Sequence, residues 1–160
     1  LFLLVGMIYE QTHTRDFDVY GGLWKIMPVY GTVMLVVTLS SMGLPGLNGF
    51  VGEFTILLGA FGSEAIGSAW YAGISAIGVI LAAIYMLSMY QKIFLGPEGS
   101  IVQTVKDKGH PLRDLSVREL VTIVPLLVFI FWIGLYPKPF FALIAPTVDN
   151  LVKVLQAAMG

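Results

Sequence analysis

The chain has 160 residues, of which 57% are hydrophobic and only 12% charged, and its formal net charge is −1. Soluble domains contain about 25% charged residues, so this composition argues against a soluble domain. Because the sequence has no cysteine, it excludes disulfides and thiolate ligands for zinc or iron–sulfur clusters. The two histidines lack ligand spacing and no basic, aromatic-rich surface is apparent, so we expect neither a metal site nor nucleic-acid binding.

Three long stretches of the chain contain no Asp, Glu, Lys, Arg or His: 26–52, 65–91 and 120–137. Each has the length of a bilayer span, since a transmembrane helix needs about 20 predominantly apolar residues. Only helices and closed barrels can satisfy their backbone hydrogen bonds inside a membrane. We therefore predict an all-α membrane protein with about three to four transmembrane helices, one of them broken at Pro45, and a C-terminal amphipathic helix.

The first part of the chain is apolar from its first residue. Residues 1–9 are too short to span a bilayer, so we expect them to be the end of a span in a longer protein. A polar connection follows, and residues 26–63 then form an almost wholly apolar run whose single charged side chain is Glu53. As one helix, this run would be roughly 57 Å long, about twice a hydrocarbon core of about 30 Å.

A break in this run is predicted where Gly43, Pro45 and Gly46 come together. Proline removes a backbone donor and clashes with the preceding turn, so we predict one broken span over residues 23–61. A broken helix frees backbone groups that can hold water beside an acid and act as a hinge. The alternative is a simple kink. A lone carboxylate such as Glu53 is costly in an apolar run unless it has a partner or a function.

The remaining elements are two spans and a tail. Residues 67–92 are rich in small residues, which allow close helix packing in lipid, and residues 118–136 form the last predicted span. In the tail, residues 146–158 place apolar side chains at helical spacing with polar ones between them. This pattern predicts an amphipathic helix that lies on the membrane or against a partner.

The orientation is predicted from the basic residues. Seven of the nine lysines and arginines lie in the connections at residues 10–25 and 92–118. The positive-inside rule predicts that both connections face the cytoplasm of a bacterial inner membrane, or the equivalent side of an organellar inner membrane, with the C-terminus outside. Glu53 would then lie roughly 13 Å from the outer surface.

Several stretches resemble a known family. The sequences YEQTHTRDFDVYGGLWKIMP and TLSSMGLPGLNGFVGEFTILLGAF closely resemble the antiporter-like chain M, or subunit 4, family of respiratory NADH:quinone oxidoreductase, complex I. The resemblance continues through IYMLSMYQKIFLG and LSVREL, so that it covers nearly the whole chain. GLPGLNGFVGEF is a specific motif in its length and composition.

The resemblance implies a fold of fourteen transmembrane helices, two of them broken at midmembrane, in which charged residues and water form a proton channel. It implies that this chain is the C-terminal part of one such proton-translocation domain, with Glu53 as the terminal proton carrier of the outlet half. Sister chains generally have lysine at that position, so the glutamate favours chain M. Transport would be coupled to NADH oxidation by quinone.

The resemblance also implies partners and cofactors. The partners would be the lipid bilayer and other membrane-arm subunits of complex I, including neighbouring antiporter-like chains, one of which the C-terminal amphipathic helix would touch. No redox site or cofactor is expected in this chain, because FMN, the iron–sulfur clusters and quinone would belong to other subunits.

Five further residues are weaker candidates for a proton path or for coupling. The hydroxyls of Thr38, Ser40 and Ser41 are candidates for lining water at the break, although hydroxyls in membrane helices more often bond to their own backbone. His13 titrates near neutral pH in its unperturbed state, but a histidine in a polar loop is most often solvated. Lys25 is either an interfacial anchor or part of a proton inlet.

Two other functions remain open at this point. One is a subunit of a multisubunit Na⁺/H⁺ antiporter, or of a ferredoxin- or hydrogenase-linked relative. The other is a purely structural membrane module, in which Glu53 would be an idle acid that is hydrogen-bonded between helices.

Overall fold

The computed structural model describes residues 1–63, 69–107 and 112–159, and in these ranges it contains helices and no strand. The predicted start of one span, residues 67 and 68, lies outside the described residues. The helices are, in chain order, α1 (Phe2–Thr12), α2 (Pro28–Ser41), α3 (Asn48–Phe61), α4 (Ala69–Phe94), α5 (Ser100–Asp107), α6 (Val117–Leu135) and α7 (Lys138–Met159). Two 3₁₀ turns, η1 (Phe17–Val19) and η2 (Leu23–Lys25), lie between α1 and α2.

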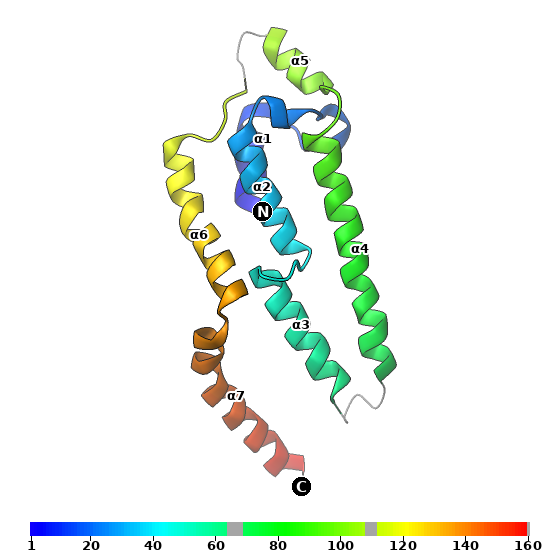
Figure 1. Ribbon diagram of the computed structural model, residues 1–160, viewed down its shortest axis with the longest axis vertical. Helices are drawn as coiled ribbons and strands as arrows, with labels where there is room; N and C mark the ends of the chain where they lie inside the picture. The colour runs from blue at the N-terminus through cyan, green and yellow to red at the C-terminus, as the bar shows by residue number, and fades with distance from the viewer. Residues whose placement is uncertain (64–68, 108–111, 160) are drawn as a thin grey trace.

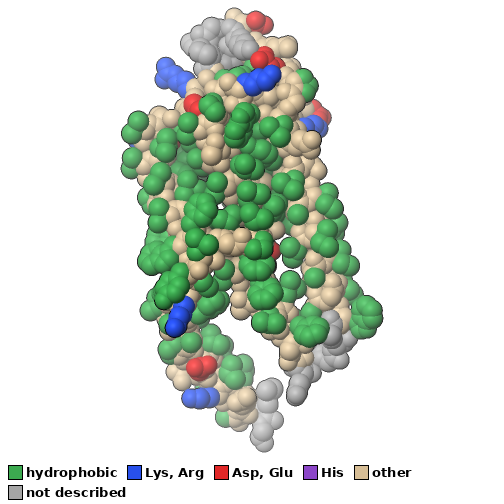
Figure 2. Space-filling model, in the orientation of Figure 1, with side chains coloured by type: hydrophobic (Ala, Val, Ile, Leu, Met, Phe, Trp, Pro, Cys, Tyr) green, Lys and Arg blue, Asp and Glu red, His purple; other side chains and the backbone are tan. Residues whose placement is uncertain are grey.

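The helices form an elongated bundle. In Figure 1, α2 and α3 follow one another down the middle, α4 runs along one side of both, and α6 lies on the other side. The connections that carry η1, η2 and α5 gather at one end, and α7 extends from α6 past the opposite end. Figure 2 shows charged side chains mainly at the two ends and a largely hydrophobic surface between them, as expected for a membrane protein.

The predicted broken span is confirmed. Two helices of 14 residues each, α2 and α3, take the place of one long helix and are separated by residues 42–47. Each is about 21 Å long, too short to cross a bilayer alone. Among the described residues, three helices are long and apolar enough to cross one: Trp70–Phe94, Val117–Leu135 and Lys138–Ala158.

The structure differs from the predicted elements in three places. The first half of the broken span begins at Pro28 rather than at residue 23, because proline suits the first helical position. The connection between the next two spans contains a helix, α5, that the sequence interpretation leaves out. The tail helix α7 begins at Lys138 rather than at residue 146, since Pro139 falls in its first turn, where proline is tolerated.

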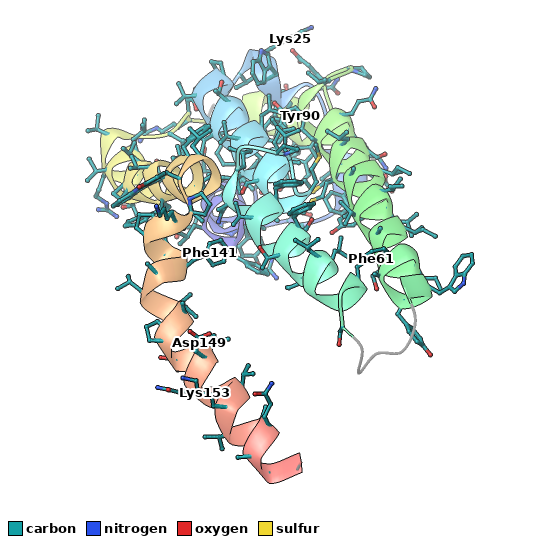
Figure 3. The ribbon with its side chains drawn as sticks, turned by 60° about the horizontal axis from the view of Figure 1, so that its bottom comes forward. Lys25, Phe61, Tyr90, Phe141, Asp149 and Lys153 are labelled. Carbon is teal, nitrogen blue, oxygen red and sulfur yellow. The ribbon has the colours of Figure 1, made fainter. Side chains whose placement is uncertain are left out.

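The longer α7 has a second consequence. By length and composition, α7 is also able to cross a membrane. The predicted amphipathic helix over residues 146–158 did not indicate this. Residues 141–158 are exposed along their whole length. In Figure 3, the part of α7 that carries Asp149 and Lys153 projects away from the other helices.

An aromatic core fixes α2 against α4. The rings of Tyr30 and Phe94 stack with centroids 5.7 Å apart, and those of Tyr90 and Phe94 with centroids 4.7 Å apart. The Tyr90 hydroxyl donates to the Gly31 carbonyl at 3.2 Å, and the Tyr30 hydroxyl donates to the Leu4 carbonyl at 2.8 Å. Because these bonds join three helices, they set the register of α1, α2 and α4 at this end.

The two basic connections contact each other at the same end of the bundle. The Lys92 ammonium lies 2.5 Å from a carboxylate oxygen of Asp18, and this hydrogen bond, together with the positive charge, holds the pKa of Asp18 below its ordinary value. The amide of Gly99 donates to the carbonyl of Gly21 at 3.2 Å. The two segments therefore form one layer, called here the loop end.

Asp114 caps α2 from the connection that precedes α6. Its carboxylate oxygens accept the amides of Val29 and Tyr30, each at 2.8 Å. The residue at the N-cap position of α2, Met27, provides no side-chain bond, so the acceptor comes from 84 or 85 positions away in the chain. The first turn of a helix has amides without intrahelical partners, and a carboxylate satisfies them favourably.

Removing this cap should loosen the start of α2. Asp114→Ala is expected to destabilise the first turn by about 1 kcal/mol, as for other lost helix caps, and to speed amide hydrogen exchange at Val29 and Tyr30. Asp114→Asn should have a smaller effect because its amide oxygen still accepts. Asp107, exposed at the end of α5, provides the control variant Asp107→Ala. Unchanged exchange in Asp114→Ala would contradict this assignment.

Candidate functional site

The break between α2 and α3 is a compact turn. The amides of Met42, Gly43 and Leu44 donate to carbonyls in the last turn of α2 at 3.1 to 3.2 Å. Gly43 and Gly46 have φ angles of 77° and 95°, a backbone region in which only glycine is free of strain. Pro45 lies between them. The three residues predicted to break the helix therefore all lie in the turn.

The two half-helices approach each other closely at this point. A Cβ placed on Gly49 would lie 1.9 Å from the carbonyl oxygen of Ser40, so no side chain fits there. The Ser40 hydroxyl donates to the side-chain oxygen of Asn48, the first residue of α3. Since Ser40 is buried, this bond joins the two half-helices inside the protein.

The end of α6 closes the break from another side. A Cβ on Gly134 would lie 2.2 Å from the carbonyl oxygen of Gly46 and 2.5 Å from the Cα of Leu47. Backbone therefore contacts backbone, and the absence of a side chain at Gly134 makes this approach possible.

Glu53 reaches back into the break from the second turn of α3. Its atom Oε2 would be 2.2 Å from a Cβ on Gly43, so the carboxylate occupies the space that a side chain at Gly43 would fill. Oε2 is buried and has no hydrogen-bond partner among the described residues. An ionised carboxylate without a partner is costly to bury, so this position calls for a proton, water or a cation.

An open pocket of about 270 Å³ adjoins Glu53. Its other walls are residues of α3 and α4, and these are Ile56, Leu57, Ser75, Gly78, Val79 and Ala82. The pocket is largely apolar, and Glu53 is the only ionisable residue in its lining. Water that enters it could therefore reach the carboxylate.

The three candidate hydroxyls differ in their surroundings. Thr38 is 0% exposed in the last turn of α2, and its hydroxyl has no hydrogen-bond partner among the described residues. Ser40 is buried and bonded to Asn48. Ser41 is exposed on the surface of α2. Only Thr38 thus combines complete burial with an unused hydroxyl.

His13 and Lys25 lie at the loop end, far from the break. Both side chains are exposed, and α2, about 21 Å long, separates Lys25 from Glu53. Figure 3 shows Lys25 and Phe61 at opposite ends of the α2–α3 pair. His13 ends α1 with a φ of 53°, and its ring packs edge-on against Tyr9 at 6.0 Å. The structure therefore does not bring these residues together with Glu53.

Two residues of the site were not anticipated from the sequence. Asn48 joins the half-helices, and the sequence signal that could have identified it is an amide side chain two residues after the Pro45–Gly46 pair, within an apolar run. The role of Gly134 depends on the contact between α6 and the break, which no local sequence pattern reveals. Within the described ranges, no group of three or more His, Asp or Glu side chains could hold a metal ion.

Comparison with known proteins gives consistent relatives. The family described as "NADH:quinone oxidoreductase/Mrp antiporter, TM" matches residues 1–85, more than half of the chain. The chain is 38% identical over its whole length to NADH-quinone oxidoreductase subunit M of Rhodobacter capsulatus, and covers 29% of that protein. It is 39% identical over 96% of its length to NADH-ubiquinone oxidoreductase chain 4 of Arabidopsis thaliana, again covering 29% of the relative.

A solved structure has the same fold. A chain of respiratory complex I from Thermus thermophilus with bound NADH superposes with a TM-score of 0.80 at 32% identity, over 96% of this chain and 30% of that one. The present chain thus spans a little under a third of the length of these relatives. It is an integral membrane protein, and it belongs to the family of membrane subunits of NADH:quinone oxidoreductases and Mrp antiporters.

Proposed function

We propose that this chain forms the outlet half of a proton channel in a membrane-arm subunit of NADH:quinone oxidoreductase, with Glu53 as its proton carrier. One observation carries the proposal: the Glu53 carboxylate lies in the break of a membrane helix with a buried oxygen that has no protein partner in the described ranges. The names of the relatives, subunit M and chain 4, support the assignment to this enzyme.

In this role, Glu53 must bind and release one proton. A carboxylate locked in an ion pair or a full set of hydrogen bonds resists protonation, because those interactions stabilise its charge. Glu53 has no such bond to Oε2 and borders an open pocket. It is therefore free to bind a proton that arrives through water and to pass it on.

The direction of transport follows from the basic connections. Both lie at the loop end, which the positive-inside rule assigns to the cytoplasmic side. Glu53, beyond the break, then belongs to the outer half of the membrane. Moving one proton against 100 mV costs about 2.3 kcal/mol, and this energy would come from NADH oxidation at the FMN, iron–sulfur and quinone sites of other subunits. The partners would include neighbouring antiporter-like chains.

A second function is kept because the matched family also covers Mrp antiporters. In that case, transport would exchange Na⁺ for protons and would not depend on NADH. Proton movement in membrane vesicles, measured with NADH and then with a Na⁺ gradient as the driving force, separates the two functions.

Glu53→Gln tests the proposal. The substitution keeps the size of the side chain and removes its ability to bind and release a proton, so proton pumping by the full complex in membrane vesicles should fall to background. NADH oxidation and the amount of assembled complex are measured alongside. The matched control is Glu10→Gln at the exposed end of α1. Normal pumping in Glu53→Gln would overturn the proposal, as would equal losses in both variants.

A further inference from the structure

The hydroxyl of Thr38 differs from six other threonine and serine hydroxyls in the helices. These six donate to the carbonyl four residues earlier at 2.6 to 3.1 Å, and they belong to Thr12, Thr32, Thr55, Ser88, Thr104 and Thr122. This bond is the usual way for a helical hydroxyl to satisfy itself. Thr38 is fully buried and makes no such bond.

A buried hydroxyl without a hydrogen-bond partner lowers the stability of the folded protein. Leaving a buried polar group without a partner costs about 1–3 kcal/mol, and native proteins satisfy nearly all such groups with protein atoms or with ordered water. Within the described ranges only one other buried side-chain oxygen or nitrogen has no partner, and this is Oε2 of Glu53. Both unsatisfied atoms thus belong to the same broken helix.

The register of α2 against α4 places Thr38 near one end of the pocket that Glu53 borders. The bond from the Tyr90 hydroxyl to Gly31 fixes the register of α2 against the antiparallel α4. Seven residues further along α2, about 10 Å from Gly31, Thr38 reaches roughly the level of Ala83 on α4, seven residues before Tyr90. The neighbouring residue, Ala82, lines the pocket beside Glu53.

The chain connects them as well. The carbonyl of Thr38 accepts the amide of Met42 at 3.1 Å, and the next residue, Gly43, is the one against which the Glu53 carboxylate lies. No hydrogen bond joins the two side chains directly. A water molecule between them would satisfy both, because buried water typically makes about three hydrogen bonds to polar groups.

We propose that Thr38 is a positioning residue whose hydroxyl holds a water molecule against the Glu53 carboxylate, on the side of the break that faces α2. This inference rests on the proton-carrying role proposed for Glu53. The water donates a proton to Oε2, which forms the carboxylic acid, and it recovers a proton from the next water toward the loop end. Only O–H bonds form and break, so one proton moves and nothing is oxidised or reduced.

Proton pumping, measured together with stability, separates this role from that of an idle hydroxyl. Thr38→Val preserves the shape of the side chain and removes the hydroxyl. If the hydroxyl has no function, the variant is at least as stable as the native protein and pumps normally, since it has lost only an unsatisfied polar group. If the hydroxyl holds the water, the variant keeps its stability and pumps poorly.

The experiment uses the intact complex in membrane vesicles. Thr38→Val should lower the rate of proton pumping during NADH oxidation about fivefold to tenfold, which corresponds to a loss of about 1–1.4 kcal/mol of transition-state stabilisation. Thr38→Ser, which retains the hydroxyl, should restore pumping. The matched control is Thr32→Val, on the same helix but exposed and bonded to Pro28. Thr38→Ala provides a second variant without the hydroxyl if the valine variant does not assemble.

A spectroscopic readout goes with the transport measurement. In infrared difference spectra, the carboxylic C=O stretch of protonated Glu53 is identified as the band that Glu53→Gln removes. It should move to higher wavenumber in Thr38→Val, because the acid loses a hydrogen bond, and it should stay in place in Thr32→Val. Normal pumping with an unmoved band in Thr38→Val overturns the inference, and so does a serine variant as defective as the valine variant.

Failure of this inference can be told from failure of the proposed function. If Glu53→Gln abolishes pumping while Thr38→Val leaves it intact, the carrier role stands and the water site is wrong. If Glu53→Gln pumps normally, the proposed function itself is wrong, whatever the Thr38 variants do.

Discussion

Under the function proposed for Glu53, Gly43→Ala is expected to lower proton pumping on the order of a hundredfold while leaving most of the complex assembled. The new Cβ would lie 2.2 Å from Oε2 of Glu53, well inside van der Waals contact. The carboxylate stands at the end of a flexible side chain, so it can move out of the break rather than unfold the helix. A displacement of about 1 Å in a reacting group can cost about 10²-fold in rate. Pumping per NADH oxidised in membrane vesicles measures the effect.

Gly46→Ala is the matched control for this prediction. Gly43 and Gly46 both have positive φ angles, so alanine at either position costs about 1–2 kcal/mol of backbone strain. A Cβ on Gly46 would meet only the Leu135 side chain, at an ordinary distance of 3.8 Å. The two variants should therefore lose similar thermal stability, and only Gly43→Ala should lose most of its pumping. Equal pumping by both would refute the position assigned to the carboxylate.

Gly134→Ala should have the second large effect, on assembly rather than on transport. Its Cβ would lie 2.2 to 2.5 Å from the backbone of Gly46 and Leu47, and neither backbone can move aside as a side chain can. Overpacking a tight contact typically costs about 1–3 kcal/mol, and here it would also force α6 away from the break. We expect much less assembled complex on native gels, with correspondingly lower NADH oxidation and pumping.

A glycine in open surroundings provides the comparison for this substitution. Gly73 of α4 has no atom within 4 Å of an added Cβ, and alanine favours a helix over glycine by about 1 kcal/mol. Gly73→Ala should therefore assemble normally. If Gly134→Ala also assembles normally, the close approach of α6 to the break is wrong.

The broken span could be predicted from the sequence because its signals are local. A run of 38 residues is too long for one crossing, and Gly43, Pro45 and Gly46 coincide in its middle. The ends of α3 and α6 also lie within two residues of the predicted boundaries. The start of the tail helix was predicted wrongly: α7 begins at Lys138, eight residues before the predicted start at residue 146.

The contacts of the site could not be predicted because they depend on packing between distant segments. The sequence shows that Glu53 is a lone acid, but not that its side chain reaches back to Gly43. The sequence also shows three hydroxyls near the break. It does not show that the Thr38 hydroxyl has no hydrogen-bond partner or that Ser41 is exposed. Helical spacing alone does not determine which face of α2 is buried when nearly every residue is apolar.

The cap on α2 also affects the order in which the helices can reach their final structure during synthesis. The acceptor for the amides of Val29 and Tyr30 is Asp114, more than 80 residues later in the chain. When α2 and α3 enter the membrane during synthesis, Asp114 has not yet been made, and the start of α2 has to rely on water at the interface. The broken helix therefore gains its final anchor only when α6 is inserted. A chain stopped before Asp114 would present the break and its acid on a helix that is still loosely held at the loop end.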